Sequence, residues 1–245
     1  MIRIEICANS VRSALIAQEA GAYRIEFCDN LKEGGTTPSF GQIALARQQL
    51  NIKLYPIIRP RGGDFLYTDL EFEVMKKDIE QCLALGCDGV VFGVLDANGR
   101  VDKPRCEQLI KAAGKMGVTF HRAFDRCSDP FEALEDIIEL GFERILTSGL
   151  EADVVSGADL IARLVKQAAG RIQIMPGAGV KPENLAHLIE MTKATEYHTT
   201  AKGPLESEMA YREVRTGSKA EEFMTEQTDP DTVSALVQIA EKYSL

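Results

Sequence analysis

The chain has 245 residues, of which 45% are hydrophobic and 27% are charged, and its formal net charge is −9 at pH 7. These proportions are typical of a globular protein with a sizeable core. The negative charge argues against surfaces that bind nucleic acid or an anionic membrane. We therefore expect a small molecule or a metal ion as the ligand, with no nucleic acid and no membrane as partners.

Hydrophobic alternation and capping signals predict strands and helices that alternate along the chain. Ile2–Cys7 is the first expected strand, with its three isoleucines on one face, and a helix follows to about residue 20. Tyr23–Cys28 repeats the strand pattern. Further strands are expected at 53–58, 88–93, 118–124, 143–147, 171–175 and 195–199. Further helices are expected at about 40–50, 69–85, 102–116, 129–140, 158–169, 182–189 and 229–243.

Eight strands alternating with eight helices predict an α/β fold, the (β/α)8 TIM barrel, in a single domain over residues 1–245. A doubly wound sheet is the rival architecture. The first strand–helix turn, Cys7-Ala8-Asn9, lacks the glycine-rich dinucleotide fingerprint, which lowers that rival. Residues 203–228 form the one long irregular segment expected, which could be a lid, an oligomer contact or a flexible excursion.

The amino-terminal residues show no basic region followed by an apolar run, so no signal peptide is expected. No apolar stretch reaches the length of about 18 residues that suggests a transmembrane helix. These features predict a cytoplasmic protein, in which the six cysteines would be thiols rather than disulfides. Their spacing does not match a structural zinc site.

Period-two alternation assigns many polar and ionisable side chains to the barrel axis. Buried charge is costly unless it is paired. One interpretation is a structural network in which Arg3 and Arg24 neutralise Glu5 and Glu26. The other is a functional site, because barrel sites form at the carboxyl ends of the strands. The expected axis residues are Glu5, Cys7, Glu26, Cys28, Tyr55, Ile57, Arg59, Thr119, His121, Ser148, Gln173, Met175, Glu196 and His198.

Cys7 and Cys28 end neighbouring expected strands and face the same way. Such strands lie about 4.8 Å apart, so the two thiols can approach each other. Soft thiolate ligands favour Cu(I) in a reducing cytosol, which makes these two residues the candidate metal ligands. The alternative is that both are small apolar fillers of the core. The other cysteines are expected on or near helices as packing residues: Cys82, Cys87, Cys106 and Cys127.

A second set of residues suggests acid–base chemistry on a substrate. His121 and His198 fall at strand ends, where each could exchange a proton near neutral pH. Arginines around Pro60 could bind a carboxylate or phosphate, and the glycines after the seventh strand could bind phosphate or simply serve tight turns. Arg122 is expected to face outward or cap the rim. The candidate catalytic residues are Glu26, His121, Glu196 and His198; the candidate substrate-binding residues are Arg59, Arg61, Asp64, Asp125, Ser148, Gly177 and Gly179.

Nine motifs between residues 2 and about 201 resemble the CutC family of copper homeostasis proteins. They are EICANS (Glu5–Ser10), RIEFC (Arg24–Cys28), GGTTPS (Gly34–Ser39), IIRPRGGDF (Ile57–Phe65), DGVVFGVLD (Asp88–Asp96), VTFHRAFD (Val118–Asp125), RILTSG (Arg144–Gly149), GAGV (Gly177–Val180) and EYHTTA (Glu196–Ala201). The resemblance implies a TIM barrel, a cytosolic location, a homo-oligomer (dimer or larger) and Cu(I) bound inside the barrel by the two cysteines that correspond to Cys7 and Cys28.

Three functions remain open at this point. The first is copper homeostasis through Cu(I) bound by Cys7 and Cys28. The second is a TIM-barrel enzyme for a small anionic or hydroxylated substrate, because Cu(I) requires neither Arg59 nor His121 nor Glu26. The third is a barrel that serves only as an interaction scaffold.

Overall fold

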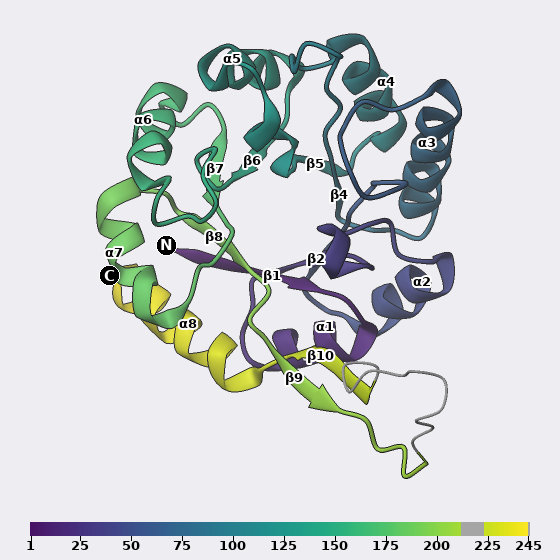
Figure 1. The fold of residues 1–245 in the computed structure, drawn as a ribbon, viewed down its shortest axis with the longest axis vertical. Helices are drawn as coiled ribbons and strands as arrows, with labels where there is room; N and C mark the ends of the chain where they lie inside the picture. The colour runs from purple at the N-terminus through teal and green to yellow at the C-terminus, as the bar shows by residue number, and fades with distance from the viewer. Residues whose placement is uncertain (212–222, 245) are drawn as a thin grey trace.

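The computed structural model describes residues 1–211 and 223–244 and shows a closed ring of parallel strands surrounded by helices (Figure 1). The strands form two sheets of order β3-β2-β1-β8 and β4-β5-β6-β7. One junction is bonded directly, since the Ile58 amide donates to the Val91 carbonyl at 2.7 Å, and β7 packs on β8 at the other. The predicted (β/α)8 TIM barrel is confirmed. The strands are β1 (Arg3–Ala8), β2 (Arg24–Phe27), β3 (Lys53–Pro56), β4 (Gly89–Phe92), β5 (Gly117–Phe120), β6 (Arg144–Thr147), β7 (Gln173–Pro176) and β8 (Glu196–Thr199).

The helices begin where the sequence places capping residues. The Ser10 hydroxyl accepts a hydrogen bond from the Ser13 amide, and Thr68 forms a capping box with Glu71. Asp129 caps a helix that starts at a proline, where a missing amide costs nothing. None of the helices in the described chain combines the length and apolar character needed to cross a membrane. The helices are α1 (Val11–Glu19), α2 (Phe40–Gln49), α3 (Asp69–Ala84), α4 (Lys103–Ala113), α5 (Pro130–Leu140), α6 (Ala158–Ala168), α7 (Pro182–Thr192) and α8 (Pro230–Lys242).

The two faces of each strand contribute to different layers. Residues such as Ile6, Ile25 and Phe120 pack outward against the helices in the main hydrophobic core. The inward face holds the ionisable residues and a small separate apolar cluster. That inner cluster consists of Cys7, Cys28, Tyr55, Ile57 and Val91. Period-two alternation thus separates an ordinary apolar layer from an unusual barrel axis.

The fifth strand is shorter than predicted. β5 ends at Phe120, and Arg122–Arg126 forms a short 3-10 helix, η2, with His121 as its N-cap. A second 3-10 helix, η1, spans Leu31–Glu33. The prediction that the strand continues to Phe124 was wrong because the η2 turn replaces the two-residue alternation from His121 onward.

The prediction that residues 203–228 form an irregular segment was wrong at its two ends. β9 (Lys202–Glu206) and β10 (Met224–Thr228) pair in an antiparallel ribbon that extends away from the barrel beside α1 (Figure 1). The Thr228 amide donates to the Ser13 hydroxyl at 3.2 Å, which ties the ribbon to α1. The middle of the predicted segment, residues 212–222, lies outside the described residues.

A candidate metal and ligand site inside the barrel

Cys7 and Cys28 meet inside the barrel. Cys7 belongs to β1 and Cys28 directly follows β2, and their Sγ atoms are 3.2 Å apart. Both side chains are buried and reduced, and they pack with Tyr55 and Ile57 in the inner apolar cluster. The predicted approach of the two thiols is therefore present in the structure. Their role as metal ligands stays a prediction.

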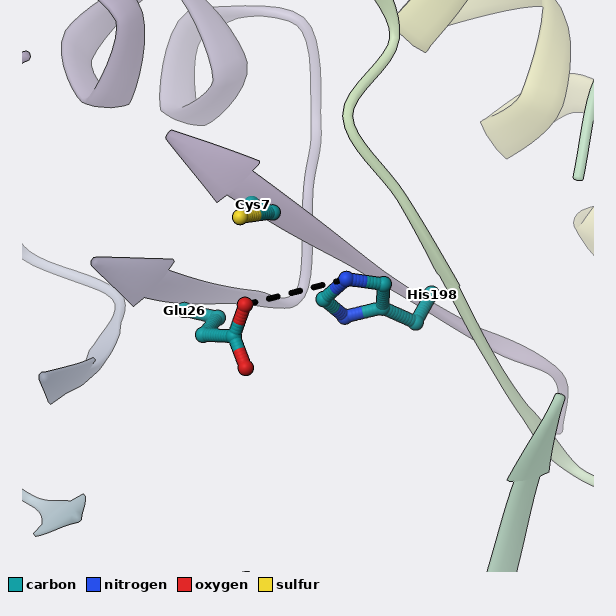
Figure 2. A group of neighbouring side chains, drawn as sticks. All are labelled: Cys7, Glu26 and His198. Atoms are coloured by element: carbon teal, nitrogen blue, oxygen red, sulfur yellow. Dashed lines mark ion pairs between the residues drawn. The ribbon is translucent and has the colours of Figure 1, made fainter. Parts of the chain in front are cut away.

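Two further donor groups lie beside the cysteines (Figure 2). Strand register places Cys7 opposite Glu26 and places Glu5 opposite His198. One donor atom each from Cys7, Glu26 and His198 lies within 4.8 Å of the other two, and Figure 2 shows the three side chains converging from β1, β2 and β8. Nε2 of His198 is 3.7 Å from Oε2 of Glu26. This group can offer an ion sulfur, nitrogen and oxygen ligands together.

The environment changes the protonation of this group. Burial raises the pKa of the Glu26 carboxyl above its usual value, although the charge of His198 works against that rise. Burial lowers the pKa of His198, but the charge of Glu26 and the hydrogen bond with Glu5 together raise it by more than burial lowers it. The net shift is therefore upward. The hydrogen bond with Cys28 and burial both raise the pKa of the Cys7 thiol. Cys7 is therefore a thiol at neutral pH unless an ion displaces its proton.

A buried ion-pair network lies next to this group on the barrel axis, toward the amino-terminal ends of the strands. Arg24 pairs with both Glu5 and Glu196, and Nε of Arg144 lies 2.9 Å from the Glu196 carboxylate. Burial alone would raise the pKa of Glu5, but the charge of Arg24 and the hydrogen bond from His198 lower it to about 2. Arg3 reaches Glu196 at 3.4 Å instead of pairing with Glu5. The structural interpretation therefore holds for Glu5, which is neutralised by Arg24.

Glu26 behaves differently from Glu5. No ion pair with an arginine is found for Glu26 in the described chain, and its charged neighbour is His198. Glu26, His198 and Cys7 also line a cavity of about 960 Å³ that opens at the carboxyl ends of the strands. Glu196, in contrast, is held by arginines and does not line this cavity in the described chain. Four of the candidate substrate residues do line it: Asp125, Ser148, Gly177 and Gly179.

His121 also lines the cavity, with its ring held in one orientation. Its Nδ1 accepts a hydrogen bond from the Ala123 amide at 3.3 Å, and its ring packs on Phe65 with the centroids 4.9 Å apart. The ring also requires glycine at position 93, because a Cβ there would lie 2.8 Å from Nδ1. Burial and the charges of Arg59 and Arg122 lower the pKa of His121 to about 3. The imidazole is therefore neutral at physiological pH, and its predicted acid–base role stays a prediction.

The three candidates in the loop after β3 have internal partners. The Arg59 guanidinium donates to the carbonyls of Glu33, Gly35 and Gly63, and so clamps two loops together. Arg61 pairs with Glu71 at 2.6 Å and with Asp64 at 3.0 Å. These three predicted substrate-binding residues lie outside the residues that line the large cavity in the described chain. Arg59 instead lines a neighbouring cavity of about 250 Å³.

Asp125 and Ser148 organise the loops at the rim. Oδ1 of Asp125 accepts hydrogen bonds from the Thr147 hydroxyl and from the amides of Ser148 and Leu150. The Ser148 hydroxyl donates to the Glu151 carbonyl at 2.7 Å. Both residues therefore shape the wall of the cavity, whatever binding role they have.

Two residues of this region escaped the sequence prediction. Arg144 lies on the barrel axis. The period-two alternation that assigned Ser148 to the axis also assigns Arg144 to it, because the two residues are four positions apart. Arg122 was expected to face outward or cap the rim, yet it lines both cavities. The alternation does not apply to Arg122, because β5 has already ended and η2 has changed the direction of the chain.

The CutC family matches residues 2–203 of this chain. The CutC protein of Chromobacterium violaceum is 51% identical to this chain over 242 residues, which cover 98% of each chain. The CutC protein of Parabacteroides distasonis is 51% identical over 239 residues, which cover 96% of this chain and 98% of the relative. The solved CutC structure from Streptococcus agalactiae, a protein to which a role in copper homeostasis is ascribed, has a TM-score of 0.79 at 38% identity, covering 82% of this chain and 99% of that one. Phosphoribosylanthranilate isomerase from Thermotoga maritima, with a TM-score of 0.60 at 13% identity and coverage of 99% and 100%, shares the barrel fold. The chain belongs to the CutC family.

Proposed function

We propose that the chain acts in copper homeostasis by binding Cu(I) through the thiolates of Cys7 and Cys28. The observation that carries this proposal is the 3.2 Å separation of two buried Sγ atoms, of which that of Cys7 lies within 4.8 Å of a ring nitrogen of His198. Thiolate ligands select soft ions such as Cu(I), and an apolar surround excludes competing water. Membership of the CutC family supports the proposal, as does the role ascribed to the Streptococcus agalactiae relative. The predicted cytosolic location and homo-oligomer are part of the same proposal.

The donor set fits a soft ion that displaces protons as it binds. Both thiols must lose their protons to become ligands, and the elevated pKa of Cys7 makes that loss unfavourable without a metal. Glu26 lies opposite Cys7 and can accept the proton that Cys7 releases. We therefore expect Cu(I) binding to release protons and to strengthen as the pH rises.

The decisive experiment is an anaerobic Cu(I) titration against a chromogenic chelator that competes for the ion. Cys7→Ser and Cys28→Ser should each abolish competition with the chelator. Cys106→Ser is the matched control, because Cys106 is a buried thiol on α4, outside the inner cluster, and should leave the affinity unchanged. Wild-type affinity in both Cys7→Ser and Cys28→Ser would refute the proposal.

A second candidate function is acid–base catalysis on a small anionic or hydroxylated substrate. It is supported by the position of Glu26 and His198, which lie side by side where they line the 960 Å³ cavity. Carboxyl and imidazole groups of shifted pKa in a cavity are typical of such chemistry. The test is hydrogen–deuterium exchange of small keto acids and sugar phosphates in D2O, followed by NMR. Exchange should be lost in Glu26→Gln, and its absence for every compound would exclude this function.

A further inference from the structure

His121 carries a buried hydrogen-bonding atom with no partner in the described chain. Its Nε2 is buried, makes no hydrogen bond, and belongs to a side chain that lines the large cavity. The Nδ1 and Cε1 atoms of the ring face the position where a Cβ of residue 93 would lie, at 2.8 and 3.0 Å. Nε2 therefore belongs to the opposite edge of the ring, away from Gly93. Leaving a buried polar group unsatisfied costs free energy, so a ligand that satisfies it gains affinity.

The hydrogen bonds of the ring fix the position of its proton. Nδ1 faces the Ala123 amide, which is a donor, so Nδ1 must be the acceptor. The neutral ring then carries its proton on Nε2. His121 therefore presents an N–H donor, and the group that completes it must be an acceptor such as a carbonyl oxygen.

Positive charge converges in the smaller neighbouring cavity, whereas the large cavity is also lined by the carboxylates of Glu26, Asp125, Glu151 and Glu183. Arg122 and Arg126 line both cavities, and neither has an ion-pair partner among residues 1–211 and 223–244. Guanidinium nitrogens of Arg122 and Arg59 lie 3.2 and 3.4 Å from the position of a Cβ on Gly34, so the two like charges approach one another. The smaller cavity is lined by Lys32 and three arginines against one carboxylate, Glu33. An anion bound there would relieve the repulsion between these cations.

We propose that the barrel mouth binds a small anionic molecule that also carries a carbonyl oxygen. Arg122 and Arg126 hold its anionic group, and the Nε2–H of His121 donates a hydrogen bond to its carbonyl oxygen. A cavity of about 960 Å³ accommodates a metabolite of this size. This site uses no thiol; it rests on the second candidate function, whose cavity it shares, and its ligand binds there whether or not proton exchange is catalysed.

The experiment measures binding in copper-free buffer by isothermal titration calorimetry, in two arms that separate the anions. The phosphate arm compares hydroxyacetone phosphate with propyl phosphate, and the carboxylate arm compares 2-oxobutanoate with butanoate. In the arm that binds, the keto compound should bind about tenfold more tightly than its partner without the carbonyl. Uncharged dihydroxyacetone should not bind. No binding in either arm would overturn the proposal.

Three variants separate the two contacts. Arg122→Gln should weaken both compounds of the binding arm by about tenfold, since a charge-assisted hydrogen bond is lost. His121→Phe should remove only the preference for the keto compound, and His121→Gln, which restores an N–H donor, should recover part of it. Arg12→Gln is the matched control, because Arg12 is exposed on α1 and does not line either cavity. A keto preference that survives in folded His121→Phe would contradict the assignment.

A spectroscopic readout keeps the test valid if His121→Phe fails to fold. The chain has three histidines, so ¹⁵N-labelled imidazole spectra of wild-type protein are simple, and His187→Asn and His198→Asn assign His121 by elimination. The Nε2–H proton of His121 should move downfield with the keto compound and stay in place with its partner. An unchanged Nε2–H signal at saturating keto compound would overturn the proposal.

Discussion

Nδ1 of His198 lies 2.7 Å from Oε1 of Glu5, and this contact decides which imidazole nitrogen faces the cysteines. Glu5 is ionised, with a pKa of about 2, so it must accept and Nδ1 must carry the proton. Nε2 is therefore the nitrogen that can lose its proton and bind a metal. A carboxylate that orients a ligating histidine in this way is a common feature of metal sites.

The first prediction concerns His198 as a third ligand. His198→Asn removes the imidazole beside Cys7 but leaves both thiols, so Cu(I) affinity should fall by about tenfold or more rather than disappear. Competition with a chromogenic Cu(I) chelator measures the change. His187→Asn is the control, because His187 is exposed on α7. Equal affinities for wild type and His198→Asn would show that the imidazole is not a ligand.

The second prediction contrasts two buried carboxylates of the same type. Glu5→Gln leaves Arg24 without a full partner and should lower the free energy of unfolding by roughly 3–5 kcal/mol. Glu26→Gln should stabilise the copper-free protein at pH 7. The raised pKa of Glu26 means that its ionisation costs folding free energy, and glutamine resembles the protonated form. Chemical denaturation of both variants measures the difference, and similar losses in both would contradict it.

The third prediction concerns acid stability. The pKa of His121 is lowered by burial from 6.5 to about 3, so below pH 6.5 the unfolded chain binds a proton that the folded chain does not. The stability that neutral His121 contributes is therefore present above pH 6.5 and lost as the pH falls toward 3. Well below pH 6.5, the loss from this one proton approaches about 1.4 kcal/mol per pH unit.

His121→Gln isolates that contribution, because glutamine does not titrate. Urea unfolding of both proteins between pH 7 and 4 should show wild type losing its advantage over the variant as the pH falls. The other buried groups, including Glu5, are common to both proteins and cancel in the difference. A stability difference that stays constant over this range would mean that His121 is not held neutral by the fold.

The alternation of residues was sufficient to predict much of the axis. Cys7, Glu26 and His198 each follow from period two in a strand with an apolar opposite face, and the structure places all three together. Their mutual distances depend on strand register, which a single sequence does not contain. The partners of Glu5 illustrate the limit. Arg24 could be predicted as a partner of Glu5 because the two residues share a face of neighbouring strands. The hydrogen bond from His198 could not, because β8 lies far from β1 in the sequence.

Predictions failed where the backbone leaves regular structure. The order of strand, turn and 3-10 helix around His121 depends on packing against Phe65 and Gly93, which lie far away in the sequence. Arg59 and Arg61 have partners among carbonyls and carboxylates that the sequence does not reveal, and their anion-binding role stays a prediction. The pairing of β9 with β10 joins residues 18 to 26 positions apart, and polar strands of this kind carry little hydrophobic pattern.

The final prediction tests whether the network below the cysteines acts as one unit. Arg144→Met removes a partner of buried Glu196 and should destabilise the protein by about 2 kcal/mol, since Arg24 still pairs with that carboxylate. Combined with Glu196→Gln, the loss should be smaller than the sum of the two single losses, by roughly 1–3 kcal/mol. Unfolding free energies of the four proteins give this coupling.

Arg171 and Glu135 provide the matched comparison. Their ion pair is short, at 2.7 Å against 2.9 Å for Arg144 and Glu196, but both side chains are nearly half exposed. Water and salt screen such pairs, so the coupling between Arg171→Met and Glu135→Gln should stay below about 1 kcal/mol and shrink in 1 M salt. The Arg144–Glu196 coupling should change little with salt, because both groups are buried. Equal couplings for the two pairs would mean that burial does not strengthen the axial network.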